Sequence, residues 1–272
     1  MSSGKAVKLA LADGTLTFAW TLVTSGLGMA ALVLGDYLDW KGDRTPILYA
    51  IILVVNLIFV ELSVASGGAT WNPTAPMAFY VSGVGEDTLF SLALRTPSMA
   101  IGAAAGVWAV HELMPGTYRH TLGPGPNLKV DLHQGALAEG VLTFMLTLIV
   151  LYTVLRATKN RFLQTPIIVT GALILVTFGG GYTGPAMNPS DAFGWAYFNG
   201  RHTSAEHIYV YWVMPFIGAL FAAGIYRLLL SPPSSPSPRP SSPPTLSTST
   251  PVPPADSVPS SSRRRDVRKK EE

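Results

Sequence analysis

The chain of 272 residues is 48% hydrophobic and only 13% charged, and its formal net charge is +3. Soluble globular domains carry about twice that charged fraction, so the composition excludes an ordinary soluble protein and indicates a membrane protein. Because the sequence contains no cysteine, disulfides and thiolate sites are excluded as well.

Six long apolar stretches are candidate membrane spans. A span needs about 20 mostly apolar residues, because a helix rises about 1.5 Å per residue and the hydrocarbon core is about 30 Å thick. The fifth stretch is the shortest of the six. In chain order they are Val7–Leu34, Pro46–Ala65, Thr88–Val110, Gly135–Leu155, Pro166–Gly180 and His207–Leu230.

Basic residues at the ends of these stretches predict the orientation in the membrane. Lys5 and Lys8 begin the chain, and the connection between the fourth and fifth stretches carries bases without an acid. The connection after the first stretch mixes acids with bases. By the positive-inside rule, both termini are then cytosolic.

An internal repeat divides the apolar part of the chain. Residues 12–18 (ADGTLTF) in the first stretch match residues 138–144 (AEGVLTF) in the fourth. We expect one membrane domain over residues 1–230, with halves at about 7–114 and 134–230. Each half holds an odd number of spans, so the second half is inverted relative to the first. Inverted repeats place their functional site near the midplane of the membrane.

Two Asn-Pro pairs begin short helices that cannot cross a bilayer. Asn72-Pro73 and Asn188-Pro189 each follow a glycine-containing turn. Asn is a favoured N-cap, and Pro at the first helical position loses no needed hydrogen bond. The roughly ten residues that follow cover about half of the hydrocarbon core. The fold class is therefore an all-α membrane protein with six transmembrane helices and two re-entrant half-helices.

The half-helices predict what this site can do. Each presents free N–H groups and the positive end of its dipole to the centre of the membrane. If the side-chain oxygens of Asn72 and Asn188 cap their own helices, their amide nitrogens remain as donors towards the lumen. Two such donors can hold one water oxygen and interrupt a hydrogen-bonded water wire. Water and small neutral molecules would pass, and protons and cations would not.

Several charged residues lie within apolar stretches, where a charge is costly and needs partners. Asp13 and Glu139 occupy the same place in their halves. They could form a proton relay, but the repetition favours a role as anchors of the re-entrant segments. Glu61 and Arg95 could pair or could reach the end of a span.

The five histidines lie near the ends of the stretches or in loops, and they show no metal-ligand spacing. Neither a nucleophile elbow nor a phosphate loop is present. We expect no catalytic residue, no metal, no cofactor and no nucleic-acid partner. We interpret the following histidines as interfacial: His111, His120, His133, His202 and His207.

These motifs resemble the aquaporin (major intrinsic protein) family over about residues 7–230. The paired Asn-Pro-Ala boxes of that family correspond to residues 72–74 and 188–190. Its signature of an acid followed by Thr four residues later corresponds to two pairs: Asp13 with Thr17, and Glu139 with Thr143.

Within the family, the chain is most similar to the first subgroup of the plant small basic intrinsic proteins. The grounds are the Thr in the first box, the short N-terminus, the run Ala192–Tyr197 and the basic end. The resemblance implies a homotetramer with one pore per protomer, water and small neutral solutes as substrates, and an association with the endoplasmic reticulum.

The resemblance also assigns individual residues. It implies that Asp13 braces the loop around Thr70, and that Glu139 braces the loop around Thr183. The chain departs from the family at Asp191, where most aquaporins have a pore-lining Arg. It also has Thr and Ser in place of the final Ala of the two boxes. Aligned on the boxes, the other pore-lining selectivity positions fall at Pro185, Val176 and Ile52.

Residues 231–272 are dominated by Pro, Ser and Thr and by basic residues, which predicts a disordered cytosolic tail. A polyproline docking site is the alternative for this tail. The chain ends in Lys269-Lys270-Glu271-Glu272, which resembles the dilysine signal that returns membrane proteins to the endoplasmic reticulum.

Three classes of function fit these features. The first is a passive channel for water and small neutral solutes. The second is an occluded membrane protein that acts as a docking or regulatory platform through its tail. The third, an alternating-access transporter, is the weakest, because Glu61 and Arg95 have no counterpart in the other half.

Overall fold

The computed structural model describes residues 1–230, and every regular element among them is helical. The predicted tail, with Lys269 and Lys270, lies outside the described residues. The first half contains α1 (Ser3–Ser25), α2 (Leu27–Tyr37), α3 (Thr45–Ala65), α4 (Thr74–Val81), α5 (Leu89–Leu113) and the 3-10 helix η1 (Gly116–Thr121). The second contains α6 (Leu132–Tyr152), η2 (Thr153–Ala157), α7 (Arg161–Gly179), α8 (Pro189–Phe198), α9 (Ala205–Ile208), η3 (Tyr209–Val213), α10 (Met214–Ile225) and η4 (Tyr226–Leu230). The last three η elements are π-helical.

The first predicted span is not one helix but two. The chain breaks between α1 and α2 at Gly26, whose N–H turns back to the carbonyl oxygen of Val23 at 3.1 Å. Gly28, at the start of α2, lies close to η1: a Cβ added there would be 3.3 Å from the carbonyl oxygen of Thr121. The break therefore lets α2 leave the axis of α1, and the first span ends at Ser25.

Five helical segments of the described chain are long and apolar enough to cross a membrane: Ser3–Ser25, Thr45–Ala65, Leu132–Ala157, Arg161–Gly179 and Ala205–Leu229. The predicted third span, α5, is not among them although it has 25 residues. It contains Arg95 and many small residues, because it packs against α1 and α8 and buries much of its surface in protein. A helix covered by protein needs less apolar surface than one that faces lipid.

The two halves use equivalent helix crossings. In the first half, a Cβ added at Gly102 of α5 would lie 2.1 Å from the carbonyl oxygen of Gly14 in α1. In the second, a Cβ added at Gly218 of α10 would lie 2.1 Å from the carbonyl oxygen of Gly140 in α6. Gly14 and Gly140 are equivalent in the repeat. Only glycine allows the backbones to approach this closely, as is usual between helices in membranes.

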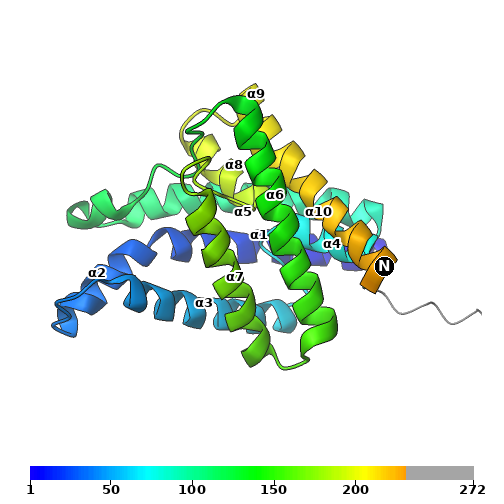
Figure 1. Ribbon diagram of the computed structural model, residues 1–272, viewed down its shortest axis with the longest axis horizontal. Helices are drawn as coiled ribbons and strands as arrows, with labels where there is room; N and C mark the ends of the chain where they lie inside the picture. Colours follow the sequence, from blue (N-terminus) through cyan, green and yellow to red (C-terminus); the bar gives the residue numbers. More distant parts are fainter. Residues whose placement is uncertain (231–272) are drawn as a thin grey trace, which may run out of the picture. The chain divides into compact units, whose positions relative to one another are not determined.

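The two short helices are exchanged between the halves. Figure 1 shows α4, from the first half, beside α10 of the second, and α8, from the second half, beside α5 of the first. The backbone contact at α8 is close, since a Cβ added at Gly194 would lie 2.7 Å from the carbonyl oxygen of Ala103. Helices of 8 and 10 residues are about 12–15 Å long, about half of the hydrocarbon thickness.

Candidate pore at the two Asn-Pro helix starts

The two Asn-Pro segments are joined by a reciprocal pair of hydrogen bonds. Asn72 Nδ2 donates to the carbonyl oxygen of Met187 at 2.8 Å, and Asn188 Nδ2 donates to the carbonyl oxygen of Trp71 at 2.9 Å. Each asparagine therefore bonds to the residue that precedes the other. An amide group has two N–H bonds, so each asparagine keeps one further donor. The sequence alone predicted that both N–H bonds of each amide are free donors. In the structure, one N–H bond of each amide is already used, and it orients the side chain.

The asparagine oxygens cap the short helices. Asn188 is the N-cap of α8, and its Oδ1 accepts from the N–H of Ser190 at 3.2 Å. At the first box the helix begins one residue later, at Thr74, with Pro73 in the cap position. Asn72 Oδ1 nevertheless accepts from the N–H of Thr74 at 3.0 Å, and it also accepts from Thr74 Oγ1 at 2.8 Å.

Glu139 accepts three hydrogen bonds from the segment that precedes α8. Its carboxylate oxygens accept from Thr183 Oγ1 at 2.8 Å and from the N–H groups of Ala186 and Met187, each at 3.0 Å. The side chain is fully buried. Met187 has a φ of +47°, a left-handed conformation that costs energy in a residue with a side chain. Glu139 thus holds a strained turn, while Tyr211 donates to the carbonyl oxygen of Thr183 at 2.9 Å.

Asp13 occupies the equivalent place in the first half but has an ionic partner. The N–H of Thr70 donates to Asp13 Oδ1 at 2.7 Å, and Arg95 donates to both carboxylate oxygens, at 2.6 and 3.0 Å. Arg95 also donates to the carbonyl oxygen of Gly68 at 2.9 Å and to Asp87 at 2.8 Å. The side chains of Arg95 and Asp13 are only 3% and 0% exposed, so the pair is shielded from water.

The two halves therefore anchor their re-entrant segments by different chemistry. The second uses one carboxylate with neutral donors, and the first uses the cluster Asp13–Arg95–Asp87. Sequence reasoning singled out Arg95 but missed both of its partners. The signal was available, because a buried cation in an apolar stretch needs a buried acid. Glu61 is not that acid, since it pairs with Arg161 at 2.8 Å on an exposed surface.

A small cavity lies beside Asn72. It has about 50 Å³ of space, and one water needs about 10–15 Å³ measured in this way, so about three to five waters fit. The polar residues of the wall are Asn72, Thr74 and Thr147. The apolar residues of the wall are Ala75, Ala78, Phe79, Leu146, Val150 and Leu151. The walls come from α4 and α6, one from each half.

The residues aligned with selectivity positions do not line this cavity. Asp191 accepts a hydrogen bond from Thr21 Oγ1 of α1 at 2.9 Å. Pro185 packs against the end of α7, where a Cβ added at Gly179 would lie 2.3 Å from its Cγ. Val176 on α7 is 40% exposed, and Ile52 on α3 is partly buried. The four residues come from α3, α7, α8 and the segment that precedes α8, and none of them lines the cavity beside Asn72.

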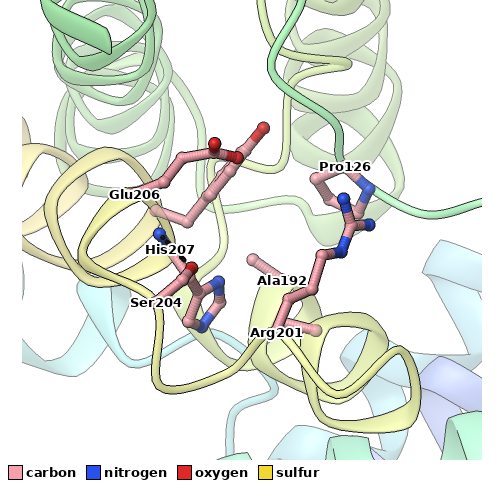
Figure 2. Close-up of a pocket in the computed structure, with 8 residues that line it drawn as sticks. Pro126, Ala192, Arg201, Ser204, Glu206 and His207 are labelled. Carbon is pink, nitrogen blue, oxygen red and sulfur yellow. Dashed lines mark hydrogen bonds between the residues drawn. The ribbon is translucent and has the colours of Figure 1, made fainter.

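A second cavity, of about 20 Å³, lies beside the short helix α8, where Ala192 and Ala196 line it (Figure 2). His207 on α9 is 4% exposed and lines it, so the interpretation of this histidine as an ordinary interfacial residue is wrong. Its Nε2 accepts from Trp212 Nε1 at 3.1 Å, and its N–H donates to Ser204 at 3.1 Å. Trp212 follows His207 by five residues, which is how π-helical backbone brings the two side chains together.

Comparison with known proteins places this geometry in a family. The model of the family "Major intrinsic protein" matches residues 2–226. Aquaporin SIP1-2 of Zea mays is 48% identical over 239 residues, which cover 87% of this chain and 98% of that protein. Aquaporin SIP1-1 of Arabidopsis thaliana is 43% identical over 233 residues, which cover 84% and 94%.

A solved structure supports the fold. The aquaglyceroporin from Plasmodium falciparum superposes with a TM-score of 0.58 at 19% identity, covering 83% of this chain and 95% of that one. The resemblance and the all-helical membrane fold expected from the motifs are confirmed by these matches. The chain belongs to the major intrinsic protein family of non-enzymatic channels, and it is a multi-pass membrane channel of the aquaporin type, similar to the plant SIP1 aquaporins.

Proposed function

We propose that this channel conducts water and other small neutral solutes passively, through a pore centred on Asn72 and Asn188. The observation that carries the proposal is the reciprocal bonding of these two side chains, which leaves one N–H on each amide. Two oriented donors at the positive ends of α4 and α8 favour a water oxygen and disfavour cations. The cavity beside Asn72, which has room for about three to five waters, supports a water path.

The structural support of this pore is part of the proposal. Asp13 and Thr70 hold the first re-entrant segment, and Glu139 and Thr183 hold the second, by the hydrogen bonds given above. Both acids have their oxygens committed to these donors, which favours an anchoring role over a proton relay. A relay needs a carboxyl that can release its proton to a neighbouring acceptor.

The outer entrance would be set by Asp191, with Pro185, Val176 and Ile52. An Asp where most relatives of the family have Arg reverses the local charge and removes donors. We expect the entrance to tolerate more solutes than an Arg-lined one does, while the central asparagines still exclude cations.

Water flux through liposomes that contain the purified protein is the direct test. Shrinkage after an osmotic step, followed by light scattering, should be faster than in empty liposomes, and Asn188→Ala should slow it or admit cations. Glu61→Gln is the matched control, because its partner Arg161 lies on an exposed surface. Liposomes that shrink no faster than empty ones would instead support the occluded platform that acts through its tail.

We further propose a homotetramer with one pore per protomer in the lipid bilayer, and both termini in the cytosol. Lys5 at the chain start and Arg156 in η2 support this orientation under the positive-inside rule. Cross-linking in mild detergent that yields only monomers would contradict the tetramer. Accessibility of an N-terminal tag from the cytosolic side tests the orientation.

A further inference from the structure

Thr74 makes two hydrogen bonds to the same atom. Its N–H lies 3.0 Å from Asn72 Oδ1, and its hydroxyl oxygen lies 2.8 Å from that oxygen. Because an amide oxygen can only accept hydrogen bonds, the Thr74 hydroxyl is the donor. The residue is 4% exposed, so water competes little for these bonds.

The second box lacks this arrangement. Ser190 stands where Thr74 stands in the first box, and it is fully buried. Its hydroxyl has no hydrogen-bond partner within the described part of the chain. Among residues 1–230, Asn188 Oδ1 accepts a hydrogen bond only from the N–H of Ser190, at a longer 3.2 Å. The two central asparagines therefore differ in how fully their oxygens are occupied.

An amide oxygen has two lone pairs, and in Asn72 both are taken by Thr74. Rotation of the Asn72 amide by half a turn would set its NH2 group against the N–H of Thr74 and would also lose the bond to Met187. Asn72 is thus fixed in one orientation and can offer only an N–H to a water molecule. Asn188 keeps one lone pair that can accept from water.

We propose that Thr74 is a positioning residue that makes Asn72 a donor without acceptor capacity towards the pore. It acts through Asn72 and does not itself need to touch the permeant. The inference rests on the proposed function only in its consequence: a water bound at Asn72 must direct both hydrogens away from the amide, so the hydrogen-bonded chain of waters cannot carry a proton past this point.

The test compares variants that keep or lose the hydroxyl. In liposomes, Thr74→Val and Thr74→Ala should raise the ratio of proton flux to water flux about fivefold, the factor that corresponds to one typical hydrogen bond. Thr74→Ser keeps the hydroxyl and should retain the wild-type ratio. If Thr74→Val and Thr74→Ala raise the flux ratio equally, the effect comes from the lost hydroxyl and not from a change in side-chain volume. Thr165→Val is the control, because Thr165 is also 4% exposed but its hydroxyl has no partner in residues 1–230.

A second readout does not depend on transport. In protein labelled with ¹⁵N-asparagine, the side-chain amide signal of Asn72, identified by its loss in Asn72→Ala, should shift and exchange faster with water in Thr74→Val than in Thr74→Ser. If wild-type liposomes conduct no water, the proposed function fails, and the amide signal alone decides the role of Thr74. Wild-type flux ratios and amide signals in Thr74→Val would overturn the inference while leaving the channel intact.

Discussion

Arg95 and Asp13 form a two-point ion pair in the interior of the protein, with Nε 2.6 Å from Oδ2 and Nη2 3.0 Å from Oδ1. The pair joins α5 to α1, and the same guanidinium holds the carbonyl oxygen of Gly68 in the first re-entrant segment. One buried cation therefore links two helices and the pore segment.

Arg95→Leu should strongly reduce stability. It leaves Asp13 buried without its cation, and removing one partner of a buried pair costs about 3–5 kcal/mol. The fraction of protein that stays monodisperse in detergent after heating measures the loss. Asp13→Leu in the same chain should restore part of the stability, because it removes the unpaired charge. Equal loss in the single and double variants would contradict the pair.

Glu139→Gln should also reduce the amount of folded protein. The amide replaces one acceptor oxygen with a donor, which faces the N–H of Met187 or Ala186, and an unsatisfied buried group costs about 1–3 kcal/mol. Size-exclusion profiles in detergent measure this. A variant that folds like the wild type but loses pH-dependent transport would favour the proton relay. Glu61→Gln is the surface control, where about 0–1 kcal/mol is expected.

Ser190→Ala should leave stability unchanged or raise it slightly. The hydroxyl is buried without a partner in the described chain, so its removal ends a desolvation cost. Heating curves in detergent measure the difference. Thr74→Ala, at the equivalent place in the first box, should lower stability by about 1 kcal/mol because it breaks a bond to Asn72. A larger loss in Ser190→Ala than in Thr74→Ala would show that Ser190 has an unseen partner.

Asp191→Arg should narrow the range of neutral solutes and lower any cation leak through liposomes. The change would place a donor-rich cation at the proposed entrance, where it would repel cations and bind permeants by hydrogen bonds. Thr21→Val provides the comparison, because it removes the partner of Asp191 without changing charge. If Asp191→Arg alters neither property, Asp191 does not face the permeation path.

Lys269→Ala with Lys270→Ala should release an N-terminally tagged protein from the endoplasmic reticulum towards later compartments. The prediction follows from the proposal that Lys269 and Lys270 form a signal read by a cytosolic receptor. Fluorescence microscopy with compartment markers measures the redistribution, and Arg263→Ala with Arg264→Ala is the control for loss of basic charge. An unchanged reticular pattern would place retention elsewhere in the chain.

Sequence reasoning was strongest where one local motif carries the information. Asn188 before a Pro predicts a capped helix start, and α8 begins there because the cap needs only neighbouring residues. Glu139 and Thr183 could be paired only through the family resemblance, and the structure joins them by a hydrogen bond of 2.8 Å. That bond spans 44 residues, so no local rule indicates it.

Other features depend on the packed structure. The break at Gly26 has no hydropathy signal, because the residues on both sides are apolar and only the contact of Gly28 with η1 explains the turn. The hydrogen bond from Asn72 to the carbonyl oxygen of Met187 joins residues that are 115 positions apart. Asp13, rather than Glu61, partners Arg95 because of the faces on which α1 and α5 meet, whereas Asp87 lies just before α5, eight residues from Arg95.

The exchange of short helices between the halves has a consequence for biosynthesis. The re-entrant helix α4 packs against α10, which begins at Met214, near the end of the described chain. A ribosome that has made only the first half has not yet supplied that surface. Two helices can pack in a membrane only when both have been made. α4 can therefore reach its place against α10 only after about 130 further residues have been synthesised. A nascent chain that stops before α10 thus lacks the helix against which α4 makes most of its contacts.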